Sequence, residues 1–249
     1  MLLKNKKINL FARQLILKDF GEKKQKIISK SHITFIGMGG INCPAVIYLL
    51  STGINNITII DHDVVTYSNL NRQILYSYKD IGRSKVKIAK KYLKKIYPNL
   101  KIKYFEKKIT KINYKDILSK TSLIIDGTDN WETMLIINDH CVKKNIPLLT
   151  ASVIGYDGNL MLFKNNKKNH LCLRCIFPNK KQVSLPRCET VGILGTSAGI
   201  IGLLAAHKTI NFLINKRSNK DESVMYFEGK DFSFSKIKLS KNVNCKLIK

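Results

Sequence analysis

The sequence lacks a run of about 20 apolar residues, which is the length that a helix needs to cross a bilayer. The basic residues 1–7 are not followed by the apolar stretch that a signal peptide carries. Internal repeats and low-complexity linkers are absent as well. These absences predict a cytoplasmic protein that has no membrane partner.

Acidic residues are few, with 17 Asp and Glu against 44 Lys and Arg, so the formal net charge is +27. Such a balance is typical of nucleic-acid-binding proteins. The lysines are nevertheless spread through the whole chain among many Asn and Ile residues, as AT-rich codons would produce. We therefore expect no nucleic-acid partner, and a solvated positive surface whose field steers anionic ligands and acidic proteins towards the chain.

Cysteines are sparse and unevenly spaced, which argues against a disulfide scaffold and favours metal or thiol chemistry. The six are Cys43, Cys141, Cys172, Cys175, Cys188 and Cys245. Cys43 and Cys141 lie in helix-like segments, so we predict that both belong to the core.

The remaining composition is that of a globular enzyme, because 249 residues with 44% hydrophobic content can bury one sizeable core. Apolar runs rich in Ile and Leu alternate with helix-like runs. The predicted strands are residues 32–37, 56–61, 100–106, 122–126 and 147–152, and the clearest predicted helices are residues 84–96 and 131–144. This alternation predicts an α/β fold with a Rossmann-like, mainly parallel sheet and helices on both faces.

The pattern changes after residue 155. Residues 158–163 and 224–239 resemble strands of hairpins, and a long apolar helix is predicted over residues 192–214. We therefore expect antiparallel strands that extend the same sheet. The chain is predicted to be one domain, residues 1–249, with a nucleotide-binding half over 1–155 and a second half over 156–249 that carries most of the cysteines.

A glycine-rich turn lies directly after the first predicted strand and directly before a helix. It contains Gly37, Gly39 and Gly40, and glycines at such a turn let the backbone approach a polyphosphate. Asp61 ends the second predicted strand, where an acid can accept hydrogen bonds from a ribose. Asn42 stands where the dinucleotide fingerprint has a third glycine, which weakens an NAD or FAD site. The alternative interpretation, a tight turn that binds no ligand, is not excluded by these residues.

A second group of charged and polar residues follows at the ends of later strands. Ser68, Asn69 and Arg72 occupy a polar loop, Lys85 begins a helix, and Asp129 and Asn130 follow the fourth strand. Phosphoryl and nucleotidyl transfer need fixed cations and a metal where charge builds on phosphate oxygens. This group therefore favours nucleotidyl transfer over dehydrogenase chemistry.

These motifs in this order closely resemble those of the ThiF/MoeB/HesA family, which is related to ubiquitin-activating enzymes. The resemblance covers nearly the whole chain, from Arg13-Gln-Leu-Ile-Leu through Gly37-Met-Gly-Gly, Ser68-Asn-Leu-Asn-Arg-Gln, Gly82-Arg-Ser-Lys and Gly127-Thr-Asp-Asn to Cys172-Leu-Arg-Cys175. It implies an enzyme that uses Mg·ATP to adenylylate the C-terminal carboxylate of a small ubiquitin-like sulfur-carrier protein.

The resemblance also implies roles for single residues. Gly37, Gly39 and Gly40 would approach the ATP phosphates, and Asp61 would hold the ribose. The triphosphate would contact Asn69, beside Ser68, together with Arg72 and Lys85. Asp129 would bind Mg²⁺, with Asn130 beside it. Arg13 would reach the ATP of a neighbouring subunit in a homodimer, although an ordinary solvated arginine fits that position equally well.

The remaining cysteines take roles from the same resemblance. The spacing of Cys172 and Cys175 is that of half a zinc site. Cys245 matches a third ligand, whereas Ile248 stands at the position of the fourth and cannot ligate zinc. Either water or a side chain such as His170 completes a weaker site, or the metal has been lost. Cys188 matches a thiol that links covalently to the carrier, and an incidental cysteine is the alternative.

The identity of the carrier rests on local stretches. Residues 150–159, residues 175–179 and the segment around Cys188 lean towards the thiamine branch, which implies a ThiS-like carrier. The alternatives are the molybdopterin-synthase carrier, a nucleotide-dependent oxidoreductase, and a basic nucleic-acid-binding protein with a decayed enzyme fold.

Overall fold

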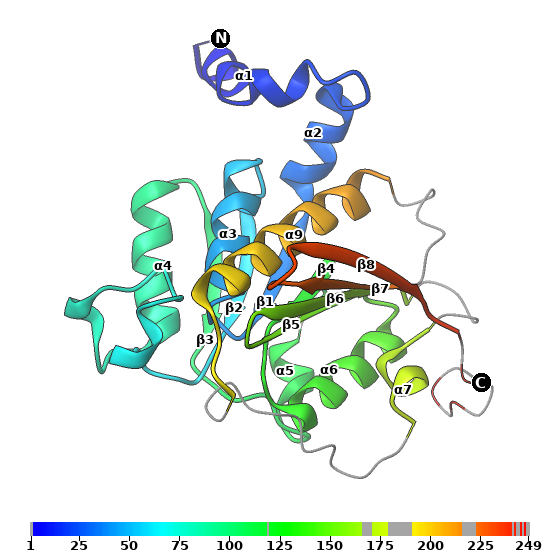
Figure 1. Cartoon of the computed structure of the whole chain (residues 1–249). Helices are drawn as coiled ribbons and strands as arrows, with labels where there is room; N and C mark the ends of the chain where they lie inside the picture. Colours follow the sequence, from blue (N-terminus) through cyan, green and yellow to red (C-terminus); the bar gives the residue numbers. More distant parts are fainter. Residues whose placement is uncertain are drawn as a thin grey trace.

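The computed structural model describes residues 2–118, 120–165, 171–178, 191–215 and 223–240, together with residues 242, 245 and 247. Its centre is a sheet of eight strands in the order β3-β2-β1-β4-β5-β6-β7-β8 (Figure 1). Helices cover both faces of this sheet, as the sequence predicts. The predicted α/β class is confirmed.

The first five strands form the parallel half of the sheet. They are β1 (His32–Ile36), β2 (Asn56–Ile60), β3 (Lys101–Phe105), β4 (Leu123–Asp126) and β5 (Leu148–Ile154). Each neighbouring pair among them is parallel. Short, Ile-rich strands of this kind are buried on both faces, which is why they read as continuous apolar runs.

The last three strands form the antiparallel half. They are β6 (Asp157–Phe163), β7 (Ser223–Glu228) and β8 (Ser233–Lys238). The chain reverses from β5 into β6 through Gly155, which has a positive φ of 60°, and the two strands then pair over seven residues. The prediction that the second half extends the same sheet is therefore confirmed.

The helices follow the predicted alternation closely. They are α1 (Leu2–Leu15), α2 (Gly21–Lys30), α3 (Asn42–Ser51), α4 (Lys85–Ile96), α5 (Tyr114–Ile117), α6 (Trp131–Lys144), α7 (Leu173–Ile176) and α9 (Gly195–Ile214), with short 3₁₀ turns η1 (Tyr67–Asn69) and η2 (Tyr78–Asp80). The predicted helix over 192–214 begins three residues later, at Gly195. The polar loop after β2 contains the two 3₁₀ turns, which the sequence pattern did not indicate.

Alternate residues of each parallel strand point to two different cores. On β1, Ile33 and Phe35 pack with α3, α4 and α9, whereas Ile36 packs with α5, α6 and α7. Successive side chains of a strand point to opposite faces, so a strand that is apolar throughout serves both cores. The two cores fix the layers of the fold, and α6 lies on the face opposite α9 (Figure 1).

Helix α9 is long and apolar enough to cross a membrane by composition. Its most apolar 18-residue window is 50% buried within the described part of the chain. The helix packs against α3, β5 and β6. That environment is the one of a core helix.

A close crossing joins α9 to α3. A Cβ atom added to Gly202 would lie 2.6 Å from Cγ of Pro44 and closer still to the carbonyl oxygen of Ile41. A Cβ atom added to Gly199 of the same helix would meet nothing within 4 Å. The crossing therefore needs glycine at position 202, where α9 presses on the turn that precedes α3.

We expect Gly202→Ala to lower the free energy of unfolding by about 1–3 kcal/mol, because the added methyl group overpacks a backbone contact. Gly199→Ala is the matched control, and should raise stability by about 0.5–1 kcal/mol because alanine is the better helix former. Urea denaturation of both variants measures the two changes. Equal stabilisation by both substitutions would contradict the tight crossing.

Candidate active site

The carboxyl ends of three central strands meet at one edge of the sheet. In the parallel register, Ile36 pairs with Ile60 on one side and with Asp126 on the other. The amide of Gly37 donates to the Ile60 carbonyl at 2.8 Å, and the amide of Gly127 donates to the Ile36 carbonyl at 3.0 Å. The segments that follow β1, β2 and β4 are thereby held side by side, and all predicted nucleotide residues of the first half lie in or after these segments.

The turn after β1 is closed by its glycines. Gly37 has a φ of 77°, and a Cβ atom there would lie 3.1 Å from the Gly127 carbonyl oxygen. A Cβ atom on Gly40 would lie 3.2 Å from both Cβ of Ala198 and Cγ of Arg72. Both positions therefore require glycine for close packing. Gly39 is more open, since its nearest neighbour would be 3.9 Å away.

Asn42 occupies the first position of α3 and is fully buried. Its Nδ2 donates to the carbonyl oxygens of Ile36 at 3.0 Å and Gly37 at 2.7 Å. The same atom would lie 2.9 Å from a Cβ atom on Gly127. The side chain that replaces the third glycine thus ties the end of β1 to the start of α3 and covers Gly127.

Asp61 is buried and links β2 to the glycine turn. Its Oδ2 accepts the amide of Met38 at 2.6 Å, and its Oδ1 accepts the amide of Asp63 at 2.9 Å. Burial raises the pKa of this carboxyl, while the Lys85 charge and the two amides act in the opposite direction. The structure therefore gives Asp61 a definite role in orienting the turn, and each oxygen keeps a further lone pair for a ribose hydroxyl.

Lys85 is the buried cation of this edge. Only 6% of its side chain is exposed, and its Nζ lies 2.9 Å from Oδ2 of Asp63, which is half exposed. The backbone supports this pair, because the amide of Lys85 donates to the Asp63 carbonyl at 3.0 Å. A buried ammonium group beside the glycine turn can meet an anionic ligand with little screening by solvent.

The loop after β2 brings Arg72 against the turn. Its Nη1 donates to the Ser68 carbonyl at 2.9 Å and to Oδ1 of Asn71 at 3.0 Å. Asn69 lies in the 3₁₀ turn η1, and its carbonyl accepts the amide of Arg72 at 3.1 Å. Ser68 is exposed and Asn69 is half-buried, so the structure places these three predicted residues on one loop beside the glycines.

The segment after β4 holds Asp126, Asp129 and Asn130. Asp129 is exposed, whereas Asn130 caps α6 by accepting the amide of Thr133 at 2.9 Å. Asn130 therefore has a structural task that the sequence did not suggest. Asp129 follows β4 at the same edge as the glycine turn, where a carboxylate is open to a metal ion.

Three residues at this edge were not predicted from the sequence to belong to the site. Asp63 pairs with Lys85, and the hydroxyl of Tyr76 donates to the Met38 carbonyl at 2.9 Å within the turn. Asp126 is fully buried, and its Oδ1 accepts both the amide and the hydroxyl of Thr128 at 3.0 and 2.7 Å. A signal existed for Asp63 and Asp126, since both are acids at strand ends. None existed for Tyr76.

Two predicted site residues lie apart from this edge. Arg13 is exposed in the last turn of α1, which projects from the body of the molecule (Figure 1). The end of α1 is tied to α3 because Gln14 and Gln25 both donate to the Thr52 carbonyl at 3.0 Å. Cys188 lies outside the described residues, as do His170 and Ile248.

Three cysteines meet in the core beside α6. Sγ of Cys172 lies 3.8 Å from Sγ of Cys175 and 3.7 Å from Sγ of Cys245. All three are buried, at 0%, 7% and 8% exposure. Burial, followed by the neighbouring thiol of Cys175, raises the pKa of Cys172 to about 12. Three convergent sulfur atoms can hold a metal ion.

The predicted core cysteines are confirmed. Cys43 and Cys141 are both fully buried. Burial raises the pKa of Cys43 to about 12 and also raises the pKa of Cys141. Neither thiol is therefore prepared for nucleophilic chemistry.

The sequence is similar to known proteins over nearly the whole length of the chain. A model of the ThiF family matches residues 11–247. The sulfur carrier protein ThiS adenylyltransferase of Escherichia coli is 31% identical over 235 residues, which are 94% of this chain and 92% of that protein. The adenylyltransferase and sulfurtransferase MOCS3 of Culex quinquefasciatus is 32% identical over 98% of this chain and 56% of its own length. The chain thus spans about half the length of the MOCS3 relatives.

Solved structures share the fold at lower identity. Escherichia coli MccB with ATP superposes with a TM-score of 0.78 at 18% identity, over 90% of this chain and 69% of that one. PaaA superposes with a TM-score of 0.75, also at 18% identity, over 94% of this chain and 73% of that one. These likenesses concern the fold alone.

Asp126 makes the stability of the folded chain depend on pH. Burial, as the largest cause, raises its pKa from 3.8 to about 6, and its Oδ2 has no hydrogen-bond partner among the described residues. The folded chain then binds more protons than the unfolded chain between about pH 4 and pH 6. Stability conferred by the protonated form is therefore present below about pH 4 and lost as the pH rises through about 6.

We expect Asp126→Asn to remove this dependence. Relative to the wild-type chain, the variant should gain about 1–3 kcal/mol of stability as the pH rises from 4 to 7, because its amide stays neutral. Urea denaturation at several pH values, without nucleotide, measures the difference between the two chains. A difference that stays constant across this range would contradict the raised pKa.

Proposed function

The chain belongs to the ThiF family, and we propose that it is an adenylyltransferase that activates the C-terminal carboxylate of a small ubiquitin-like sulfur-carrier protein with ATP. The products would be the carrier acyl-adenylate and pyrophosphate. The observation that carries the proposal is the gathering of a glycine turn, the buried Lys85 ammonium and Arg72 at one edge of the sheet. The relatives named as adenylyltransferases support it.

The reaction needs cations more than it needs a base. The reference pKa of a C-terminal carboxylate is about 3.5, so the nucleophile is already ionised at neutral pH. The barrier lies in bringing this anion to the α-phosphate and in moving charge onto pyrophosphate. Lys85 and Arg72 would lower that repulsion and stabilise the departing pyrophosphate.

The pair formed by Lys85 and Asp63 suggests how the cation is kept ready. At 2.9 Å the exposed carboxylate neutralises the buried ammonium while no phosphate is bound. We infer that Lys85 turns from Asp63 to the triphosphate when ATP binds, so that one carboxylate contact is exchanged for phosphate contacts. Asp61 would accept the ribose while it holds the Met38 amide.

A magnesium ion would be held by Asp129, with Asn130 beside it in the nucleotide pocket. Asp129 is an exposed carboxylate after β4, and carboxylate oxygens are the ligands that Mg²⁺ prefers. When bound, the ion would neutralise charge on the phosphate oxygens. Asn130 keeps its amide nitrogen for the nucleotide, together with one lone pair of the oxygen that caps α6.

Asn42 weighs against the oxidoreductase alternative. Its buried side chain bonds the carbonyls of Ile36 and Gly37 and covers Gly127, at the position where a dinucleotide fingerprint has its third glycine. We therefore prefer ATP to NAD as the nucleotide.

We also propose that the enzyme works as a homodimer in the cytoplasm. Arg13 is exposed on a helix that projects from the body of the chain, so it is free to reach the ATP of a second subunit. The free, buried Cys43 and Cys141 fit a reducing compartment. Cys188 would serve sulfur transfer after adenylylation.

The carrier we propose is ThiS-like, because the thiamine-type stretches of the sequence agree with a relative that matches over 92% of its own length. The molybdopterin-synthase carrier is the second candidate, favoured by the MOCS3 relatives at similar identity. A SAMP-activating enzyme E1 of Haloferax volcanii is 26% identical over 96% of this chain. Relatives with similar sequences thus carry the names of enzymes for different carriers.

The site assignment is tested by carrier-dependent ATP–pyrophosphate exchange. We expect Arg72→Ala, Lys85→Ala and Asp129→Ala each to lower exchange by at least about 100-fold, because each removes a charge that meets the phosphates. Lys87→Ala is the matched control on the same helix, since its Nζ pairs with Glu106 on the surface at 2.7 Å. Near-normal exchange in any of the three variants would remove that residue from the site.

The carrier is tested in the same assay with two purified proteins. We expect exchange with the ThiS-like carrier to exceed exchange with the molybdopterin-synthase carrier. The reverse order would reassign the chain to the second candidate while leaving adenylylation in place. Exchange with neither carrier would count against the proposed activity.

We further propose that Cys172, Cys175 and Cys245 hold zinc. Thiolates that bind Zn²⁺ tetrahedrally at about 2.3 Å lie about 3.8 Å apart, and the sulfur separations are 3.7 and 3.8 Å. The ion would join α7 and the residue before it to the C-terminal segment, and it would hold all three thiols as thiolates.

We expect the purified chain to contain about one zinc ion per molecule, and Cys245→Ala to lose most of it because a ligand is removed. Cys141→Ala is the control, since Cys141 is a buried cysteine of the same core without a place in the cluster. Elemental analysis by mass spectrometry measures the metal. A wild-type chain without zinc, or equal zinc in both variants, would contradict the site.

A further inference from the structure

A cavity lies at the opposite edge of the sheet from the nucleotide residues. Its volume is about 760 Å³, and it is bounded by α5, by the residues before β4 and β5, and by the last turn of α6. These segments adjoin the amino ends of β4 and β5, whereas the glycine turn adjoins carboxyl ends. Helix α6 runs between the two edges, and its 14 residues span about 21 Å.

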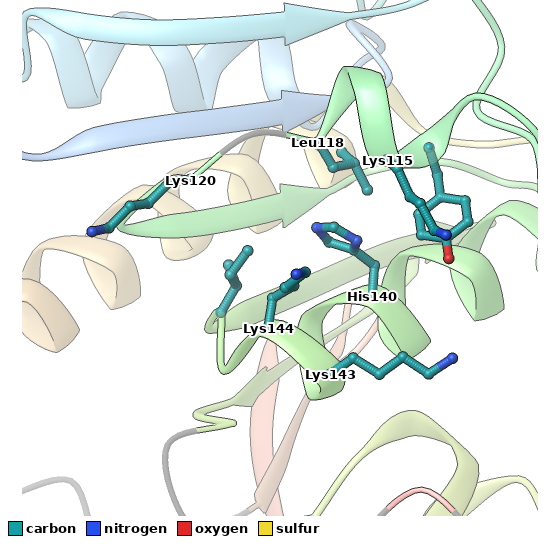
Figure 2. A pocket seen from close by; sticks show the side chains of 8 residues that line it. Lys115, Leu118, Lys120, His140, Lys143 and Lys144 are labelled. Carbon is teal, nitrogen blue, oxygen red and sulfur yellow. The ribbon is translucent and has the colours of Figure 1, made fainter.

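Four lysines from three segments line this cavity: Lys115, Lys120, Lys143 and Lys144 (Figure 2). No carboxylate is among its lining residues. Within the described part of the chain, none of the four lysines forms an ion pair. Four like charges around one cavity repel one another, and a bound anion would relieve that repulsion.

His140 supplies the buried polar atom of the cavity. The residue is 5% exposed, and its Nε2 has no hydrogen-bond partner among the described residues. The ring bonds the Leu118 backbone, and burial followed by the Lys144 charge holds its pKa below the usual range. Figure 2 shows the imidazole between Leu118 and Lys144. A buried nitrogen without a partner is costly, so a hydrogen-bonding group that enters the cavity would be stabilised there.

The neutral imidazole narrows the choice of anion. A lone pair on Nε2 can accept a proton from an acidic hydroxyl, and a phosphate monoester, with a second pKa of about 6, keeps such a proton on a minor part of its molecules at neutral pH. A carboxylate has no such proton at neutral pH. The proton can then lie on either partner, and the lysines meet the remaining phosphate charge.

The remaining lining is apolar. Leu118, Ile146 and the ring of Tyr114 border the same space, and the Tyr114 ring packs edge-on against His140 with centroids 5.5 Å apart. An inorganic anion would leave this surface uncovered. A ligand with an apolar ring or chain beside its phosphate would cover it.

We propose that this cavity binds a small organic phosphate monoester, with its phosphate among the four lysines and Nε2 of His140 and its apolar part against Leu118, Ile146 and Tyr114. The site uses none of the residues assigned to adenylylation. Its occupant would therefore be a separate ligand, bound while ATP occupies the other edge.

Isothermal titration of the full chain with phenyl phosphate tests the proposal, with inorganic phosphate and phenol as separate arms. Phenyl phosphate should bind at one site and more tightly than either arm, because only it presents both the charge and the ring. Failure to bind, or equal binding of phenyl phosphate and inorganic phosphate, would overturn the proposal.

The chain offers a matched control for the site's location. Lys143 and Lys144 are the last two residues of α6, and Lys94 and Lys95 lie in the last turn of α4, directly before its final residue Ile96. The double variant Lys143→Gln/Lys144→Gln should weaken phenyl phosphate binding at least about tenfold, because two charged contacts are lost. Lys94→Gln/Lys95→Gln should bind as the wild-type chain does. Equal weakening in both would show attraction by overall charge and overturn the site.

The variant His140→Phe distinguishes a specific phosphate site from attraction by the charge of the lysines alone. The substitution keeps a ring against Tyr114 and removes Nε2, and its folding is checked by thermal denaturation. We expect binding of phenyl phosphate to weaken severalfold at an unchanged number of lysines. Unaltered binding would overturn the role of His140. Carrier-dependent exchange should be normal in this variant and in Lys143→Gln/Lys144→Gln, so the proposed adenylylation stands or falls separately.

Discussion

The parallel register at the centre of the sheet is the constraint on which the candidate active site depends. Ile36 pairs with Ile60 and with Asp126, so β1, β2 and β4 end level with one another. Three loops that are far apart in sequence then leave the sheet at the same edge. A slip of one residue would exchange the two faces of a strand and separate Asp61 from the Met38 amide.

Two cores hold this register from opposite sides. Strands that are apolar throughout bury one set of side chains under α3 and α9 and the other under α5 and α6. The tight crossing at Gly202 brings α9 close to α3, and Gly195 at the start of α9 approaches the loop that carries Arg72. The packing that stabilises the fold thus also places the residues we assign to the triphosphate.

Helix α6 connects the parts of the molecule that carry chemistry. Its first turn follows Asp129, and its last turn supplies two lysines to the cavity that His140 lines. Its middle contacts the segment that carries Cys172 and Cys175, since Asn138 accepts the Leu173 amide at 2.8 Å. The partly exposed ion pair between Asp139 and Arg174 supports the same contact. One rigid helix therefore relates three sites that lie on different loops.

The sequence by itself determined the class of fold, the element order and the strand-end motifs, because apolar periodicity and glycine turns are local properties of the chain. It indicated Asp61, Arg72 and Lys85 for the same reason. Only the tertiary structure decided that Asp63 pairs with Lys85, that Asn130 caps a helix and that the three cysteines expected at a zinc site are buried in a core. It also decided that four lysines and a buried His140 line one cavity. These contacts join residues distant in sequence or depend on side-chain orientation, which no local pattern encodes.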